Sequence, residues 1–366
     1  MRFDSSYRAE NNGVDRVCAV PIRYVARTAL KLCGVVKVNI DAPVVAGSGV
    51  LVLHRQLQAK LDNYRVRALS PMMGLYPRLC QVVAREPAEL AHSLPELGPW
   101  VVHPDAQLVA TFHNYYLDDV YCRQVGILRR HYYQRVLASA VEAALRRATV
   151  LTAVSRATAD LVLTHHDVAT KLLVIRNGVD TRRFRPLDQE RLDGPVRVLF
   201  SGNPSPRKGL SDLLHLVDAL PENVVLQYTS GTRSSAVSTI PQSARVKALA
   251  RRPHSEMPAL YHEADVFFLP SRREGLSLAL LEAVASGLPV LTTNASSMPE
   301  VIDHGKGGFL FEPGDAINMY RYLKKLVSDP HLRAEMGAYN RAKCLSEFSE
   351  ERMLGEYRQL FGSIFV

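Results

Sequence analysis

The stretch SRREGLSLALLEAVASGLPV, residues 271–290, places two carboxylates in an otherwise apolar run. It follows ADVFFLPS (residues 264–271), which is typical of a buried strand, and its second half is typical of a helix that Ser277 can cap. Glu274 lies in the turn between strand and helix, and Glu282 lies inside the helix. Because a buried carboxylate is costly unless it accepts hydrogen bonds, this unit predicts a bound ligand.

The turn before this helix has the chemistry of a phosphate site. Backbone N–H groups at a helix N-terminus bind anions, and here they belong to Gly275, Leu276, Ser277 and Leu278. A phosphate held there would lie between the two carboxylates, so that one could bind a sugar beyond the phosphate and the other the sugar of a nucleoside. The spacing of the two acids fits equally well with two solvent-exposed side chains.

A second strand–loop–helix unit, SGNPSPRKGLSDLL (residues 201–214), carries two adjacent cations. Gly202 ends its strand, and Arg207 and Lys208 come at the helix entry, where the helix dipole disfavours positive charge. A bound phosphate would offset that cost, because arginine offers it a bidentate fork and lysine a point charge. The alternative is an exposed basic loop.

Two features of the N-terminal half also follow apolar strands. His113 ends QLVATFH (residues 107–113) and could donate to a sugar hydroxyl or transfer a proton, although a histidine at a strand end is more often structural. The loop VAGSGV (residues 45–50) contains Gly47 and Gly49, which let a ligand approach the backbone closely. It matches neither the G-x-G-x-x-G fingerprint nor a P-loop, so the sequence supports neither NAD nor Walker-type ATP binding.

Strands and helices alternate along the chain in two series, which predicts an α/β fold with two parallel sheets. A polar, proline-containing linker at residues 178–195 separates the two series. Ligands bind outside the carboxyl ends of such strands, which is where all four motifs lie. Predicted strands cover residues 35–41, 64–70, 107–113, 150–155, 171–177, 196–203, 224–231, 244–250, 264–271 and 288–294, and predicted helices cover residues 50–61, 134–148 and 350–365.

The composition restricts the class of protein. A length of 366 residues with 47% hydrophobic residues favours two globular domains. The chain has no uncharged apolar run of about 18 residues, which argues against a transmembrane helix, and its polar N-terminus argues against a secretory signal. Five widely spaced cysteines without a C-x-x-C pair predict neither a zinc site nor disulfides, and they fit a reducing cytoplasm.

The positive charge is concentrated in one half of the chain. The formal net charge is +9, yet residues 1–187 hold 25 Lys and Arg against 15 Asp and Glu, whereas residues 188–366 hold 20 against 21. The N-terminal half is therefore basic and the C-terminal half nearly neutral. A basic half predicts an anionic partner, such as a phosphorylated substrate, an acidic membrane surface or nucleic acid, and a solvated basic face is the alternative.

Five motifs, in order along the chain, resemble those of glycosyltransferase family 4, whose members are retaining enzymes of the GT-B fold. The motifs are AVSRATADLV, VIRNGVDTRRFRP, LFSGNPSPRKGL, ADVFFLPSRREGLSLALLEAVASGLPVLTT and PEVIDHGKGGFLFEPGD. Glu274 and Glu282 match the Glu-x7-Glu signature of the family. The resemblance implies two Rossmann-like domains that face a central cleft: an acceptor-binding domain at residues 1–187 with residues 1–34 as an extension, a nucleotide-sugar-binding domain at residues 188–345, and a helix at residues 346–366 that returns to the first domain.

The resemblance also implies a role for each motif. Glu274 would contact hydroxyls of the donor sugar, and Glu282 would bind the ribose of the nucleotide. Lys208, together with Arg207, would neutralise the departing diphosphate, which the backbone amides after the first acid would also bind. His113 would lie near the reacting sugar, and the glycine loop would lie near the donor phosphates and the acceptor. The implied reaction requires no metal and no other cofactor.

Two positions depart from the family pattern. Gly202 is followed by Asn203, where the family often has an arginine that binds phosphate, so phosphate neutralisation would rest more on Lys208 and Arg207. Ser277 replaces a glycine that is common in the signature, and a serine is acceptable there because the position is a helix N-cap.

The implied activity is that of a hexosyltransferase (EC 2.4) that uses a UDP- or GDP-linked sugar. The acceptor would be a glycan or a lipid-linked molecule, in the synthesis of bacterial cell-surface polysaccharide, lipopolysaccharide or glycolipid. The segment CRQVGILRRHYYQR, residues 122–135, holds four arginines and two tyrosines, so it is a candidate contact for an anionic membrane and suggests a cytoplasmic protein peripheral to the inner face of the plasma membrane.

Two alternatives belong to other classes of protein. One is a sugar-nucleotide epimerase or phosphorylase of the same GT-B fold, which product analysis with donor alone would reveal. The other is a basic nucleic-acid-binding protein, against which the absence of a recognised nucleic-acid motif counts, so we expect no nucleic-acid partner.

Overall fold

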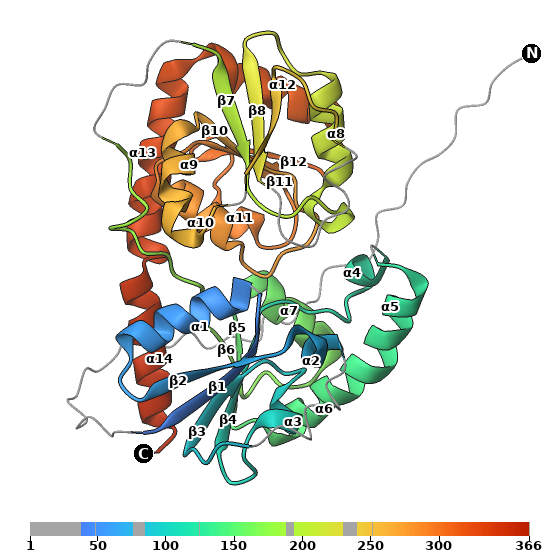
Figure 1. Cartoon of the computed structure of the whole chain (residues 1–366), viewed down its shortest axis with the longest axis vertical. Coiled ribbons are helices and arrows are strands. Elements are labelled where there is room, and N and C mark those ends of the chain that lie inside the picture. Colours follow the sequence, from blue (N-terminus) through green and yellow to red (C-terminus); the bar gives the residue numbers. More distant parts are fainter. Residues whose placement is uncertain are drawn as a thin grey trace, which may run out of the picture.

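The computed structural model describes residues 38–47, 49–75, 85–123, 125–187, 194–229, 240–250 and 252–365. Two six-stranded sheets form two lobes, with strand orders β2-β1-β3-β4-β5-β6 and β12-β11-β10-β7-β8-β9 (Figure 1). Every strand pair within them is parallel. The predicted α/β fold with two parallel sheets is therefore confirmed. The predicted extension at residues 1–34 and residues 188–193 of the predicted linker lie outside the described residues.

The first sheet is built from six strands between residues 40 and 174. Its first strand begins at Ile40 and ends at Val45, so the prediction of a strand at residues 35–41 placed it too early. The strand Leu90–Ser93 was missed because two of its four residues, His92 and Ser93, are polar. The strands are β1 (Ile40–Val45), β2 (Tyr64–Leu69), β3 (Leu90–Ser93), β4 (Gln107–Phe112), β5 (Val150–Ala153) and β6 (Leu172–Val174).

The helices of this lobe include the one predicted after the glycine loop. It is α1 (Gly49–Lys60), which begins directly at Gly49. The helix predicted at residues 134–148 is instead a π-helical turn, Tyr133–Leu137, continued by α6. The other helices are α2 (Pro71–Leu75), α3 (Gly98–Val101), α4 (Asp119–Arg123), α5 (Ile127–Tyr132), α6 (Ala138–Arg147) and α7 (Arg156–His165).

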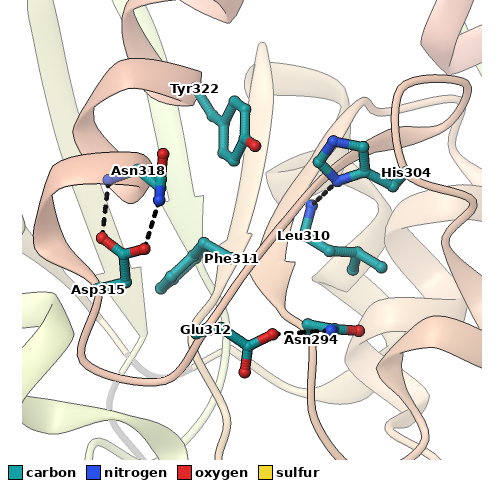
Figure 2. A pocket seen from close by; sticks show the side chains of 8 residues that line it. All are labelled: Asn294, His304, Leu310, Phe311, Glu312, Asp315, Asn318 and Tyr322. Carbon is teal, nitrogen blue, oxygen red and sulfur yellow. Dashed lines mark hydrogen bonds between the residues drawn. The ribbon is translucent and has the colours of Figure 1, made fainter. Parts of the chain in front are cut away.

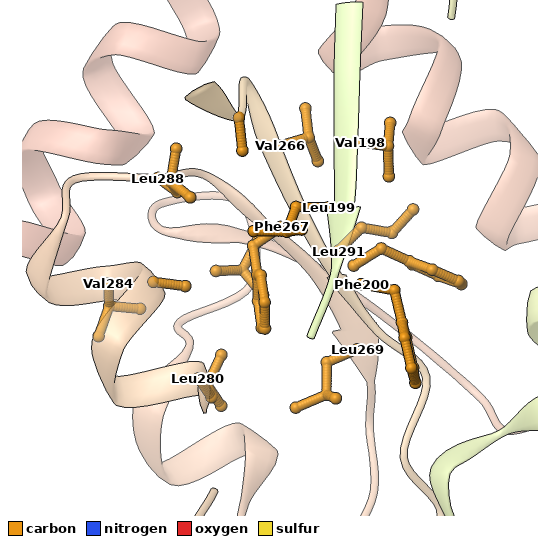
Figure 3. Close-up of a cluster of buried hydrophobic side chains, with 14 of the residues drawn as sticks. Val198, Leu199, Phe200, Val266, Phe267, Leu269, Leu280, Val284, Leu288 and Leu291 are labelled. Carbon is orange, nitrogen blue, oxygen red and sulfur yellow. The ribbon is translucent and has the colours of Figure 1, made fainter. Parts of the chain in front are cut away.

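The second sheet carries the stretch at residues 271–290. Phe200, Phe267 and Leu269 of the sheet are fully buried and pack against Leu280 and Val284 of the helix that follows (Figure 3). The strands are β7 (Val196–Phe200), β8 (Val224–Thr229), β9 (Val246–Leu249), β10 (Val266–Leu269), β11 (Val290–Thr293) and β12 (Gly308–Phe311). The helices are α8 (Leu210–Asp218), α9 (Met257–Glu263), α10 (Leu278–Ala285), α11 (Met298–Val301), α12 (Ala316–Ser328) and α13 (Pro330–Glu347).

The last helix, α14 (Glu350–Ser363), packs on the first lobe, although α13 packs against α10 and α12 of the second (Figure 1). Its apolar face, which includes Tyr357 and Phe361, shares a core cluster with Leu53 and Leu57 of α1. The chain passes between the lobes before β7 and again before α14, and these two segments lie side by side. The backbone N–H of Val179 donates to the carbonyl of Phe348 at 2.9 Å, and that of Glu350 donates to the carbonyl of Val179 at 2.9 Å. No helix among the described residues is long and apolar enough to span a membrane.

Candidate active site

Glu274 lies in the turn between β10 and α10, where it meets two cations. Its Oε1 atom is 3.0 Å from Nη1 of Arg207 and 3.5 Å from Nζ of Lys208. The hydroxyl of Ser271 donates to the same oxygen at 3.3 Å. Burial alone would raise the pKa of Glu274, but the charges of Arg207 and Lys208 outweigh that effect and lower it. Glu274 is therefore a buried carboxylate that stays ionised.

Two glycines allow the cations to come this close. Gly209 has a φ of +72°, and a Cβ atom there would clash with the carbonyl oxygen of Pro270 at the end of β10. Gly202 has a φ of +144°, and a Cβ atom there would lie 2.7 Å from Nζ of Lys208. Both backbone conformations favour glycine. The loop after β7 thus brings Lys208 to the carboxyl ends of β7 and β10.

Glu282 of α10 is 7% exposed, and both of its carboxylate oxygens have partners inside the protein. Tyr261 donates its hydroxyl to Oε2 at 2.7 Å, and Nε2 of His254 lies 2.8 Å from Oε1. Nδ1 of His254 lies 3.3 Å from a guanidinium nitrogen of Arg183, which can only donate, so Nδ1 accepts and Nε2 carries the proton given to Glu282. From the sequence we expected ligand hydroxyls as the partners of Glu282. His254 and Tyr261 were missed, because 28 and 21 positions separate them from Glu282.

The N-terminus of α10 is open to an anion. Ser277 occupies the N-cap position but makes no side-chain cap hydrogen bond. Within the described residues, the backbone N–H groups of Leu276, Ser277 and Leu278 have no acceptor. The carbonyl of Leu276 is held from the other side by the side-chain amide of Asn177, at 3.0 Å. These N–H groups, at the positive end of the helix, fit a phosphate.

His113 lies where the two lobes meet. It is 7% exposed, and a Cβ atom on Gly275 would clash with its carbonyl oxygen. The glycine of the signature turn is therefore needed for this close approach of backbones. Nearby, Nε of Arg273 donates to Oδ2 of Asp118 across the same junction at 2.8 Å. The sequence gave no sign of this pair, because the partners are 155 residues apart.

A chain of buried polar side chains extends from His113 into the first lobe. The rings of His113 and His54 are 5.8 Å apart, and the hydroxyl of Tyr64 contacts Nδ1 of His54 at 2.7 Å and Nδ1 of His92 at 2.6 Å. Nε2 of His92 lies 2.7 Å from the hydroxyl of Thr111. Burial lowers the pKa of His113 to about 4 and that of His92 to about 3, so these histidines are neutral at pH 7.

The remaining predicted residues are less closely tied to Glu274. Gly47 has a φ of +75°, which explains a glycine in the loop after β1, and Gly49 begins α1. No hydrogen bond or ion pair among the described residues joins this loop to Glu274. Asn203, at the position of the family's arginine, has a buried Oδ1 atom without a partner in the described part of the chain.

A separate pocket of about 330 Å³ lies beside the ends of β11 and β12, and none of the predicted site residues lines it. Figure 2 shows Glu312 paired with Asn294, at 2.8 Å, and Asp315 paired with Asn318. Its other lining residues are His304, Leu310, Phe311 and Tyr322. In the described residues, no group of three or more His, Cys, Asp or Glu side chains is placed to hold a metal ion.

Comparison with solved structures identifies the fold. Sucrose-phosphate synthase from Thermosynechococcus elongatus superposes with a TM-score of 0.76 at 19% identity, over 89% of this chain and 99% of that one. Anabaena HepE, solved in complex with UDP-glucose, superposes with a TM-score of 0.72 at 17% identity, over 89% of this chain and 100% of that one. The predicted GT-B fold is confirmed.

Sequence comparison agrees with this fold. The chain is 27% identical to the sulfoquinovosyl transferase SQD2 of Arabidopsis thaliana over 283 residues, which are 72% of this chain and 55% of that protein. It is 29% identical to an MMP alpha-(1->4)-mannosyltransferase of Mycolicibacterium hassiacum over 261 residues, which are 66% of this chain and 62% of that protein. The match thus spans little more than half the length of these relatives.

Two family models match consecutive parts of the chain. Residues 53–183 match "Glycosyltransferase Family 4", and residues 185–343 match "Glycosyl transferases group 1". The first match covers most of the first lobe, and the second covers the β10–α10 unit with both carboxylates. This chain belongs to glycosyltransferase family 4.

Proposed function

We propose that this protein is a retaining glycosyltransferase that moves a sugar from a nucleotide-diphosphate donor to a glycan or lipid-linked acceptor. The observation that carries the proposal is the contact of Glu274 with Arg207 and Lys208 beside the open N-terminus of α10. Two cations and free backbone N–H groups fit a diphosphate, and an adjacent carboxylate fits the hydroxyls of the attached sugar. The UDP-glucose complex of the similarly folded HepE supports a donor of this kind.

In the proposed reaction, the donor diphosphate takes the place that Glu274 now fills beside the two cations. Arg207, Lys208 and the α10 amides then stabilise the negative charge that develops on the leaving nucleotide. Glu274 is released to bind sugar hydroxyls and orients the donor without attacking it. The acceptor hydroxyl enters on the face that the diphosphate leaves, so the anomeric configuration is retained.

The proposal extends to the division of labour between the lobes. Residues 188–345 would bind the donor, with Glu282 on the ribose, and residues 1–187 would bind the acceptor, with His113 beside the reacting sugar and residues 346–366 returning to this lobe. The donor would be UDP- or GDP-linked, and no metal or other cofactor is part of the proposal, because side chains and amides supply the positive charge. We further propose that the protein acts in cell-surface polysaccharide or glycolipid synthesis, at the inner face of the plasma membrane.

The test is product analysis by NMR with UDP-glucose and GDP-mannose, each with and without acceptor sugars. We expect transfer, or slow donor hydrolysis, with retention at the anomeric carbon, and a loss of about 10²–10³-fold in turnover for Glu274→Gln. Glu312→Gln, a change of an exposed carboxylate in the separate pocket, is the matched control and should leave turnover unchanged.

Three results would contradict the proposal. Inversion at the anomeric carbon would refute the mechanism. Conversion of donor into an epimer without acceptor would establish the epimerase alternative. Full turnover in Glu274→Gln would remove the assigned site.

A further inference from the structure

The helix α5 projects apolar side chains into solvent. Ile127 is 76% exposed and Leu128 is 88% exposed, and α5 has no buried residue at all. Other large exposed apolar side chains of the described residues, such as Ile317 at 82%, stand on different elements. Two adjacent aliphatic side chains this exposed indicate a surface that is covered in use.

The segment that carries these two side chains is strongly basic. Arg123, Arg129, Arg130 and Arg135 are all exposed, and none of them forms an ion pair with a carboxylate in the part of the chain that the structure describes. Asp119 is the single acidic residue between positions 119 and 135. We call these four arginines with Ile127 and Leu128 the α5 surface.

We propose that the α5 surface docks on an anionic lipid bilayer. Aliphatic side chains at the tip of a helix can enter the bilayer interface while long arginine side chains reach the headgroups. Both contacts favour binding to a bilayer with anionic lipids. This inference rests on the proposed function, for which it names a partner. The docking itself does not depend on the transferase reaction.

Other occupants fit this surface less well. A second copy of the chain would bring like charges together, which is unfavourable. Residues 1–37 of the chain carry seven Lys and Arg against three Asp and Glu, so their charge is not complementary either. Nucleic acid would use the arginines but would gain nothing from Ile127 and Leu128.

The α5 surface is joined to the candidate active site by aromatic packing. Tyr133, directly after α5, packs on Tyr121 with ring centroids 6.0 Å apart, and the guanidinium of Arg207 lies 5.9 Å from the ring of Tyr121. Asp118, which binds Arg273 of the second lobe, immediately precedes α4. A bilayer bound at α5 would therefore lie next to the junction of the lobes, where a lipid-linked acceptor must enter.

The experiment is co-sedimentation of the full-length protein with vesicles, without donor or acceptor. Vesicles of phosphatidylcholine alone are compared with vesicles that contain about a quarter phosphatidylglycerol, at about 0.1 M and about 1 M salt. We expect binding to the anionic vesicles at low salt and much weaker binding in the other conditions.

Two double variants test the surface, each with a matched control. The arginine variant, Arg129→Gln with Arg130→Gln, should weaken binding by about 25-fold, because each arginine near an anionic bilayer contributes about fivefold. The aliphatic variant, Ile127→Gln with Leu128→Gln, should weaken it at least about tenfold. The controls are Arg65→Gln with Arg182→Gln, and Ile317→Gln, all at exposed positions, and should bind like the wild type.

Each outcome decides the inference. Unchanged binding by both double variants would overturn it, as would equal binding to neutral and anionic vesicles or no binding at all. A dimer in light scattering that Leu128→Gln dissociates, without vesicle binding, would replace the bilayer with a second copy. Because no sugar donor is present, failure of the transferase proposal leaves the vesicle result unaffected, and transfer to a soluble acceptor without vesicle binding would overturn this inference alone.

Discussion

Acidification should unfold this protein through its buried histidines. The folded protein keeps His92 and His113 neutral, with pKa values of about 3 and about 4, whereas the unfolded chain protonates both below the ordinary pKa of 6.5. Their contribution to stability is therefore complete above pH 6.5 and is lost as the pH falls from there toward the folded values. At about 1.4 kcal/mol per pKa unit, each histidine costs about 3 kcal/mol at pH 4. Together they remove about 6 kcal/mol, a large part of the ordinary 5–15 kcal/mol stability of a domain.

The assay is urea unfolding at a series of pH values between 7 and 4. Near pH 5 the unfolding free energy should fall by roughly 2.7 kcal/mol per pH unit through His92 and His113, which bind about two more protons in the unfolded chain. Burial also lowers the pKa of His54, so this histidine makes the slope steeper. His113→Gln should lower that slope by about 1.4 kcal/mol per pH unit, because it removes one of these buried imidazoles. His331→Gln, at an 83% exposed side chain, is the control and should keep the wild-type slope. A stability that stays level between pH 7 and pH 4, or an unchanged slope in His113→Gln, would refute the reasoning.

Three further predictions concern the two carboxylates of the candidate site and the contact between the two lobes. Glu274→Gln should cut turnover but keep or raise the affinity for free UDP or GDP in calorimetry, because it frees Arg207 and Lys208. Glu282→Gln should mainly weaken donor binding. Equal, unchanged activity in both variants would contradict the assignment. Gly275→Ala should force the lobes apart, since its Cβ would clash with the carbonyl oxygen of His113. It should lower kcat/KM, and small-angle scattering should show a larger radius of gyration. An unchanged radius and rate would show that the contact is dispensable. Arg273→Gln should destabilise the protein by about 3 kcal/mol, because the buried Asp118 loses its ion-pair partner and keeps the backbone N–H of Tyr121 as a donor. Adding Asp118→Asn should restore part of that loss; simple additivity in thermal unfolding would argue against the pair.

The local units of the fold could be predicted because each is specified by neighbouring residues. The alternation of apolar strands with turns and helices placed β10 to within two residues at each end and the start of α10 after Ser277. The first strand was placed too early because the apolar run continues past the predicted end, through Pro43 to Val45. Strands β3 and β12 were not predicted, although β5 and β10, which are equally short, were. In β3 two of the four residues are polar, so it lacks an apolar run.

What the sequence did not show is contact between distant segments. The partners of Glu282, His254 and Tyr261, come from the loop before α9 and from α9 itself, and no local pattern links them to α10. The need for glycine at position 275 comes from the carbonyl of His113 in the other lobe, so a residue expected only to bind phosphate is also required for packing. Such requirements arise only when the two lobes are brought together.

The central claim is that Lys208, Arg207 and the N-terminus of α10 form a nucleotide-diphosphate site. The most direct measurement is thermal unfolding with UDP-, GDP- and ADP-sugars, on the wild type and on Lys208→Gln. We predict that one donor, at about 100 times its Kd, stabilises the wild type by about 2.7 kcal/mol, and that Lys208→Gln loses most of this gain at the same concentration. No stabilisation by any of the donors, or full stabilisation of Lys208→Gln, would contradict the claim.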